Sequence, residues 1–423
     1  MNARLTGALV VGAGALGLFA APGSAFAQDA GTIPSCNDTT MFPNPIYLTG
    51  SSAFEPVIQA MAFQLNSRTV GDGGTSGKVT LIYQTGGNSC SGVAAVLNQS
   101  NLSGSAHYYT TSSGGAGQQT CTLDTAPPKA DVGISDIFYE TCGFGPRPTA
   151  VGDFAGPAQA MLVIVPKTAT SAPVSITAEE AANVWGCGSR GMITPWLVES
   201  AIQQRSATSG TQNIIARSIN VLASSFHGTM NSTGGALVTT LTGMNPMVTI
   251  ADPNTAIGFL AADSYDGTGR PTLRSLAFRG LEQTQAYYAD SSPDTFDKRN
   301  VRDGHYLPWG YEHLIVSVDG TGKPTSQAAR NFVDWVQGNT TTSDNAPNFD
   351  PVLLQATAHV IPTCAMSVQR QTDGGYLSAY TPADSCNCAF EATVTMSTPS
   401  GCLACSNDTP CTGGTHCHHG FCE

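Results

Sequence analysis

The chain has 423 residues and a formal charge of −12, from 18 lysines and arginines against 30 aspartates and glutamates. Nucleic acids and anionic membranes attract clustered basic residues, so this composition argues against both as partners. The length allows two well-packed domains or lobes of roughly 100–200 residues each.

The N-terminal segment has the pattern of an export signal. Arg4 precedes an apolar run that ends near Ala21, and the small-residue site Ala25-Phe26-Ala27 follows. This pattern predicts a signal peptide over residues 1–27 and a periplasmic, cell-surface or secreted protein. Residues 28–45 are predicted to form an N-terminal leader. No later stretch has the roughly 18–20 apolar residues that cross a bilayer.

From residue 46 onward, short apolar runs alternate with helical patterns. Alternation of this kind predicts an α/β fold with largely parallel sheets. Residues 99–129, rich in Gly, Ser and Thr, are predicted to form an insertion loop, and residues 338–350 break the pattern. The predicted strands are 79–84, 130–135, 160–166, 256–262 and 313–318, and the predicted helices are 55–66, 91–98, 177–185, 211–224 and 326–337.

The 13 cysteines are unevenly distributed, with seven between Cys386 and Cys422. In an oxidising compartment they predict disulfides, and their odd number leaves one thiol free or bound otherwise. Residues 386–423 hold too few large apolar residues for a core, so they are predicted to form a separate disulfide-stapled module. Two crossed disulfides are expected among Cys405, Cys411, Cys417 and Cys422. The motif His416-Cys417-His418-His419 also suits a metal, but an exposed hairpin with oxidised cysteines is favoured over a metal site.

Three glycine- and hydroxyl-rich turns each precede a predicted helix. They span residues 50–54, 88–92 and 205–211. A helix N-terminus leaves about four backbone N–H groups unpaired and carries roughly half a positive charge, so such turns accept oxyanions. Simple helix capping explains any one of them. Three turns together with Arg205 indicate an anion site at the carboxyl ends of the strands.

Asp136 follows the predicted strand 130–135, where a side chain would face a ligand. A carboxylate suits an anion that brings its own proton. Hydrogen phosphate does so, whereas sulfate would leave repelling acceptors unpaired at a cost of about 1–3 kcal/mol or more. The alternatives are that Asp136 caps a turn or pairs with Arg205.

The stretches LTGSSAFEPV, YQTGGNSCSGV, DVGISD, RSATSGT, AIGFLAADSY and YLPWGYEHLIVSVDG follow one another from Tyr47 toward Gln337. In order and spacing they resemble the phosphate-binding proteins of bacterial ABC importers, a group of type II periplasmic substrate-binding proteins. The resemblance implies that Asp136 accepts the phosphate proton and that Arg205 supplies the ionic contact. It also implies hydrogen-bond donors at Ser52, Ala53, Phe54, Ser89, Ser209, Gly210 and Thr211.

The resemblance further implies a two-lobed fold with parallel-rich mixed sheets and a hinge. One lobe would comprise residues 46–155 and 305–385 and the other residues 156–304, with strands 160–166 and 313–318 crossing between them. Apart from the resemblance, Cys90–Cys121 and Cys142–Cys187 are the expected disulfides. The implied ligand is inorganic phosphate and the implied partner is an ABC permease. No enzyme activity, cofactor or metal is expected.

Two departures from the family pattern affect selectivity. Ala53 replaces a usual threonine, and Ala207-Thr208 replaces an Asp-Gly pair whose aspartate moderates the charge of the arginine. A receptor for another oxyanion therefore stays an alternative. Another is a cell-surface scaffold or adhesion protein in which residues 386–423 bind an envelope partner. A hydrolase using Ser209 would need a histidine base that the sequence does not place nearby.

Overall fold

The computed structural model describes residues 33–68, 77–112, 117–124, 126–243, 247, 250–339, 347–413 and 415–423. The predicted signal peptide and part of the predicted leader lie outside these residues. The chain from Pro34 onward forms one unit. Within the described residues, no helix has both the length and the apolar character that a membrane span requires.

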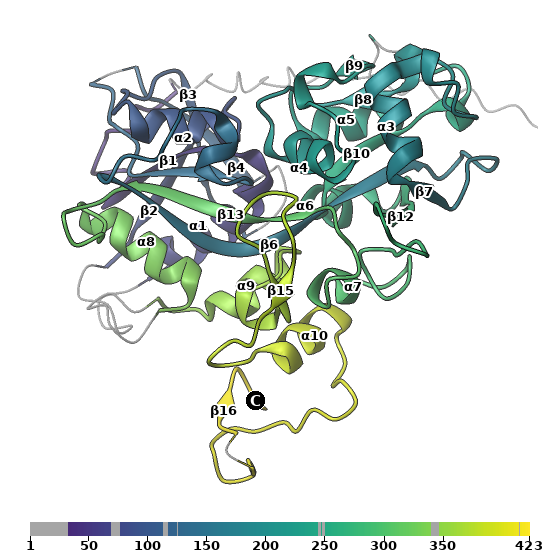
Figure 1. Ribbon diagram of the computed structural model, residues 1–423. Coiled ribbons are helices and arrows are strands. Elements are labelled where there is room, and N and C mark those ends of the chain that lie inside the picture. The colour runs from purple at the N-terminus through teal and green to yellow at the C-terminus, as the bar shows by residue number, and fades with distance from the viewer. Residues whose placement is uncertain are drawn as a thin grey trace, which may run out of the picture. The chain divides into compact units, whose positions relative to one another are not determined.

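One large mixed sheet organises the chain (Figure 1). Its strand order is β10–β6–β13–β5–β1–β2–β3–β4, with β11 also paired to β6. The strands are β1 (Pro45–Gly50), β2 (Thr80–Gln84), β3 (Ser105–Tyr109), β4 (Gln118–Thr122), β5 (Val132–Ser135), β6 (Val151–Pro166), β10 (Gly258–Ala261), β11 (Leu273–Ser275) and β13 (Trp309–Ser317).

Four short ladders complete the described strands. They pair β7 (Ser175–Thr177) with β12 (Ala277–Arg279), β8 (Gln203–Gln204) with β9 (Thr229–Met230), β14 (Val368–Gln369) with β15 (Ser378–Ala379), and β16 (Cys417–His418) with β17 (Phe421–Cys422). The predicted mixed α/β fold is confirmed, with a smaller parallel share than the alternation suggested. Parallel pairing joins β1 to β2, β1 to β5, β7 to β12 and β8 to β9. The late strand β13 lies antiparallel between β5 and β6.

The long strand β6 connects two regions of the sheet. Its first part pairs with β13, and residues from Met161 onward pair with β10 and β11. The predicted strands 160–166 and 313–318 belong to β6 and β13. Strand β6 therefore runs through both regions of the sheet, and β13 lies beside its first part.

Each of the five predicted helices is present in the structure. The predicted helix 55–66 has the observed bounds of α1, whereas the predicted helix 211–224 ends early at Ser218. Asn220 adopts a positive φ of 53°, which a continuing helix does not allow. The helices are α1 (Glu55–Asn66), α2 (Ser89–Leu97), α3 (Ala178–Cys187), α4 (Gly210–Ser218), α5 (Gly234–Leu241), α6 (Ala262–Ser264), α7 (Arg299–Arg302), α8 (Gln327–Gln337), α9 (Pro351–Thr357) and α10 (Asn387–Thr395).

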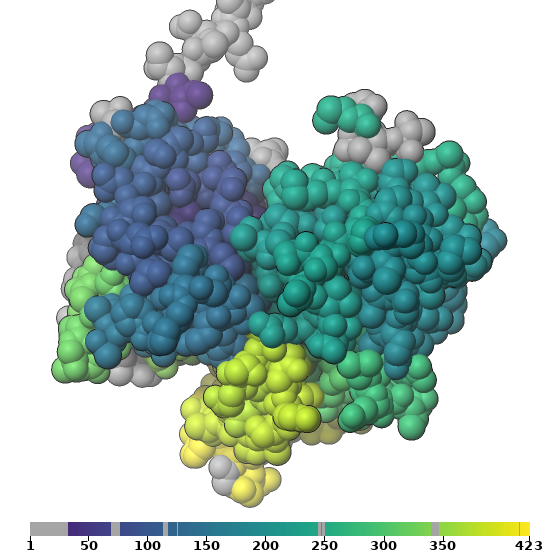
Figure 2. All heavy atoms as spheres, turned by 45° about the horizontal axis from the view of Figure 1, so that its top comes forward, coloured from purple at the N-terminus to yellow at the C-terminus, as the bar shows by residue number. Residues whose placement is uncertain are grey.

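Buried apolar side chains gather in two large clusters. One cluster is built on α1, β1, β2, β5, β13 and α8, and the other on β6, α3, α4 and β10. Figure 2 shows the corresponding blue and teal segments as neighbouring masses, with yellow-green C-terminal residues against both. Helix α10 buries Ala389 and Phe390 in the second cluster, so the residues after Cys386 begin with a helix packed on the main core.

The predicted insertion loop 99–129 is wrong in part, because β3 and β4 form an antiparallel hairpin at the sheet edge. Ala106 and Cys121 face each other in this hairpin, and both are fully buried. Cys121 is bonded to Cys36 of the N-terminal leader. Burial and a disulfide thus order a segment whose composition suggested a loop.

All 13 cysteines are described, and 12 of them form disulfides. The predicted pairs Cys90–Cys121 and Cys142–Cys187 are wrong, because Cys90 is bonded to Cys142 and Cys187 is free. Pairing depends on which β-carbons meet in space, which sequence distance does not reveal. The predicted crossed pair near the C-terminus is confirmed as Cys405–Cys417 and Cys411–Cys422. The remaining disulfides are Cys36–Cys121, Cys364–Cys386 and Cys388–Cys402.

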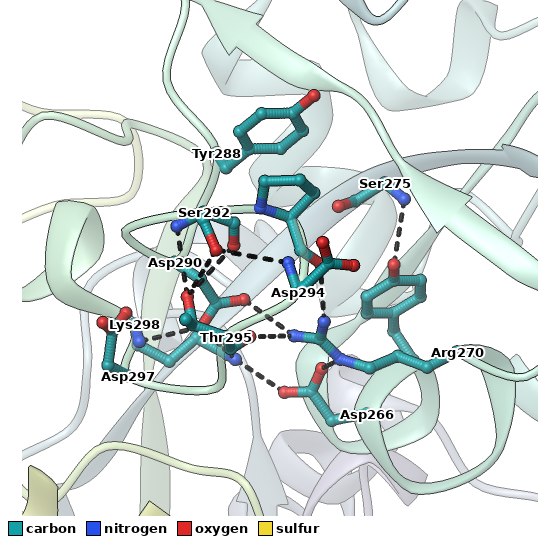
Figure 3. A network of polar contacts seen from close by, with 12 residues as sticks. Asp266, Arg270, Ser275, Tyr288, Asp290, Ser292, Asp294, Thr295, Asp297 and Lys298 are labelled. Atoms are coloured by element: carbon teal, nitrogen blue, oxygen red, sulfur yellow. Dashed lines mark hydrogen bonds and ion pairs between the residues drawn. The ribbon is translucent and has the colours of Figure 1, made fainter. Parts of the chain in front are cut away.

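A buried ion-pair network joins the turn after α6 to the segment before α7 (Figure 3). Arg270 lies 2.6 Å from Asp266 and 2.8 Å from Asp290, and Lys298 Nζ lies 2.6 Å and 2.8 Å from the same two carboxylates. Burial acts to lower the pKa of Lys298, but the two carboxylates raise it overall. Two cations and two anions balance, so this network is a structural element rather than an anion site.

Candidate functional site

The first turn of the site connects β1 to α1. Gly50 adopts a φ of +127°, and a β-carbon there would lie 2.0 Å from the carbonyl oxygen of Ile134 in β5. Glycine therefore allows β1 and β5 to approach at their carboxyl ends. Ser51 caps the turn, because its Oγ accepts from the Ala53 N–H at 3.2 Å.

The second turn begins α2, and the cap of this helix does not use the hydroxyl of Ser89. Asn88 and Ser91 form a reciprocal capping box, so they satisfy the helix start between themselves. Ser89 is 1% exposed and is not used in this cap. Its Oγ accepts from the backbone N–H groups of Gly210 at 3.1 Å and Asp136 at 3.3 Å. One hydroxyl thus connects three of the predicted site segments.

The third turn begins α4 at Ser209. Its side chain makes no capping hydrogen bond and is 3% exposed. A β-carbon on Gly210 would lie 2.5 Å from Ser89 Oγ and 2.6 Å from Asp136 Cβ, so glycine is required by close packing. Thr211 is also buried, and its backbone hydrogen bonding acts to lower the pKa of Asp136.

Arg205 follows β8 and is 8% exposed. Its backbone N–H donates to Gln212 Oε1 at 2.8 Å, and its Nη2 donates to the Ser232 carbonyl at 3.1 Å. The Nε has no hydrogen-bond partner, and no carboxylate of the described residues forms an ion pair with this guanidinium. Burial lowers the pKa of Arg205, while Asp136 and Asp263 act in the opposite direction.

Asp136 directly follows β5 and is 2% exposed. Its Oδ1 is buried without a hydrogen-bond partner among the described residues. Burial raises the pKa of Asp136, and hydrogen bonding to Ser51 and the charge of Arg205 counteract this rise. An unpaired acceptor and an unpaired guanidinium N–H therefore occur in the same site.

These groups surround one hollow with an empty volume of about 200 Å³, open solvent at its mouth included. Of the predicted residues, Ser52, Ala53, Ser89, Asp136, Arg205, Ser209 and Thr211 line it. Phe54 does not, because its side chain is fully buried in the hydrophobic core. Gly210 is not part of the lining either, and its N–H is donated to Ser89. Ser51, Gly87 and Asn88 line the hollow and were not predicted.

Sequence reasoning also missed three polar residues behind the hollow: Gln159, Asp263 and Glu312. Gln159 Nε2 donates to Asp263 Oδ1 at 3.1 Å and to the Ala53 carbonyl at 3.3 Å. Burial raises the pKa of Asp263 to about 7. Glu312 is fully buried in β13. The sequence signal that could have identified Glu312 is a glutamate within a mostly apolar stretch, because burying a charged side chain is unfavourable unless it is paired or hydrogen-bonded.

The arrangement offers groups that suit anion binding. It offers one cation, helix-start N–H groups, hydroxyls and a carboxylate, which together match the charge and the proton of a partly protonated oxyanion. Among the described residues, the one group of potential metal ligands is Cys405, Cys411 and Cys422. All three sulfurs are in disulfides, which are poor metal ligands compared with thiolates.

No protein-family model matches the chain, and no curated protein matches it either. Solved structures with a similar arrangement include one from Clostridium perfringens with bound phosphate, at 13% identity and a TM-score of 0.46, covering 76% of this chain and 100% of that one. A second is an ABC-type phosphate transport receptor from Vibrio cholerae, at 13% identity and a TM-score of 0.43, covering 75% and 99%. A third is a high-affinity periplasmic phosphate-binding protein with bound phosphate, at 16% identity and a TM-score of 0.45, covering 75% and 90%. At this level of similarity, function has to be inferred from the site itself.

Proposed function

We propose that this chain is an extracytoplasmic receptor that captures phosphate and delivers it to an ABC permease. The site would hold the anion through Arg205, the helix starts and the hydroxyls, and no bond would be made or broken. The proposed ligand residues are those of the predicted set that line the hollow: Ser52, Ala53, Ser89, Asp136, Arg205, Ser209 and Thr211. Ser51 and Asn88 are additional neighbours.

The observation that carries this proposal is that Asp136 and Arg205, which both line one hollow, each have a buried atom without a hydrogen-bond partner among the described residues. Leaving such groups without partners costs about 1–3 kcal/mol each, and more when they are charged. A ligand that presents both a proton and a negative oxygen would satisfy both atoms. Hydrogen phosphate presents both.

The same pair of atoms supports selection between oxyanions. Fully ionised sulfate has no proton to share with Asp136, so a sulfate oxygen and the carboxylate oxygen would repel each other. The absence of an aspartate at position 207 leaves Arg205 without an ion pair, which favours a second candidate, a receptor for oxyanions in general. The two candidates differ in what Asp136 contributes.

The experiment is isothermal titration of the phosphate-stripped protein with phosphate and then with sulfate, from pH 5 to 8.5. Phosphate binding without sulfate heat supports the proposal. The Asp136→Asn variant should then bind sulfate, because an amide N–H replaces the repelling oxygen.

Asp131→Asn is the matched control. Asp131 lies just before β5, at the opposite end of the strand from Asp136, and it accepts from the Tyr47 N–H at 3.0 Å. It should still exclude sulfate. Equal affinity of the wild-type protein for both anions would favour the general oxyanion receptor. Absence of heat with either anion from folded protein would sink both receptor candidates and leave the scaffold or adhesion alternative.

A further inference from the structure

Glu312 is a buried glutamate whose side chain no donor reaches. It is 0% exposed, and neither carboxyl oxygen has a hydrogen-bond partner among the described residues. A buried ionised carboxylate in this state would be strongly unfavourable. The residue lies outside the hollow described above and has no role in the proposed function so far.

The strand register places Glu312 next to Asp136. Strand β13 pairs antiparallel with β5, with His313 opposite Ser135 and Leu314 opposite Ile134, so the next position along brings Glu312 toward Asp136. The register of β13 against β6 shifts between Tyr311 and His313. Such a bulge redirects a side chain and is common beside functional sites.

The surroundings of Glu312 are acidic. The carboxyl groups of Asp136 and Asp263 both act to raise its pKa, after burial as the largest cause, and the result lies well above the ordinary range. Tyr83 is also close enough to interact, and its hydroxyl donates to the Gly50 carbonyl at 3.0 Å. Arg205 is the cation that interacts with Asp136, Asp263 and Tyr83. Three ionised carboxylates near one guanidinium would repel an anion.

We propose that Glu312 is a positioning residue that keeps its proton and donates its O–H to one carboxylate oxygen of Asp136, which keeps Asp136 ionised and leaves its other oxygen to accept the proton of the bound anion. This inference rests on the proposed function and deepens it. Glu312 hydrogen-bonds to the acceptor rather than to the ligand, and no proton leaves Glu312 during binding. The anion thereby meets one carboxylate instead of three.

The first test needs no ligand. The infrared spectrum of the wild-type protein minus that of Glu312→Gln at pH 7 should show the C=O band of a protonated carboxylic acid. The same band in the wild-type protein should fade as the pH is raised through the Glu312 pKa. A difference spectrum with only carboxylate bands at pH 7 would overturn the assignment whether or not phosphate binds.

The second test is phosphate titration of the wild-type protein and Glu312→Gln from pH 6 to 9.5. Glutamine keeps the shape and an N–H donor but cannot ionise, so its affinity should equal the wild-type value within about threefold at pH 6. Above the Glu312 pKa, the variant should become tighter than the wild-type protein by about tenfold for each further pH unit. Phosphate itself titrates equally in both samples, so the ratio of the affinities isolates Glu312.

The matched control is Glu55→Gln, because Glu55 also interacts with Tyr83 and accepts from the Tyr109 hydroxyl at 3.0 Å. It should follow the wild-type pH profile. An affinity of Glu312→Gln that differs from the wild-type value by much more than threefold at pH 6 would overturn the positioning role. If the wild-type protein shows the infrared band but gives no heat with phosphate, the phosphate assignment would be overturned. The inferred effect of Glu312 on the bound anion would be overturned with it.

Discussion

Gly210 lies where a side chain would collide with two other site residues. A methyl group there would meet Ser89 Oγ and Asp136 Cβ at 2.5 and 2.6 Å. Because overpacking typically costs about 1–3 kcal/mol, Gly210→Ala should weaken phosphate binding about tenfold or more. Titration calorimetry measures this loss.

Gly235→Ala is the control, since that glycine also lies in the first turn of a helix and its β-carbon would meet only Thr233 Oγ1 at 3.9 Å. It should bind phosphate with wild-type affinity. Equal affinities for the two variants would show that α4 does not approach Asp136 as described.

Asp263 predicts a pH dependence of stability in the ligand-free protein. Its pKa is raised from 3.8 to about 7, mainly by burial, so the folded protein binds the proton more tightly than the unfolded chain. This contribution to the free energy of unfolding is complete below about pH 4 and is lost as the pH rises toward 7 and above. Asp263→Asn should therefore lose less stability than the wild-type protein between pH 5 and pH 8. Urea unfolding at each pH measures this, and parallel curves for the two proteins would contradict it.

Among the elements, the hairpin of residues 367–380 contacts two separate parts of the site's framework. Asp373 Oδ2 accepts from the Phe138 N–H at 3.0 Å and from Thr141 Oγ1 at 2.6 Å, just after Asp136 in the chain. A β-carbon on Gly374 would lie 2.7 Å from Arg217 Cβ of α4. The disulfide Cys364–Cys386 encloses this hairpin.

Asp373→Ala should lower the free energy of unfolding by about 1–3 kcal/mol, because it removes both acceptor contacts and leaves a partly buried N–H unpaired. Chemical denaturation measures the change. The exposed Asp384 serves as the control, and Asp384→Ala should stay within about 0.5 kcal/mol of the wild-type protein. A similar small effect for Asp373→Ala would mean that the hairpin is not held by these bonds.

At the scale of the whole molecule, the ion-pair network of Figure 3 predicts where stability is concentrated. Lys298 pairs with two buried carboxylates and is itself 1% exposed. Lys298→Met should destabilise the protein by about 3–5 kcal/mol, because it leaves both carboxylates with less compensation. Lys323→Met, at an exposed loop position, should have little effect in the same unfolding experiment. Equal losses would show that the network does not stabilise the fold.

Local sequence patterns were enough to predict several main elements and the residues of the candidate site. Amphipathic periodicity located α1 and α8, and apolar runs located β2, β5 and β13, because these patterns depend on residues that are neighbours in the chain. The turns with Ser89, Arg205 and Ser209 were also visible, since helix starts have local signatures.

Contacts between residues far apart in the sequence became visible in the folded chain alone. It paired Cys90 with Cys142, placed β13 between β5 and β6, and brought Glu312 toward Asp136 across that pairing. It also placed the Phe54 side chain in the hydrophobic core rather than in the hollow. Disulfide pairing, strand order and the burial of a charge depend on contacts between residues far apart in sequence, and local patterns carry no information about such contacts.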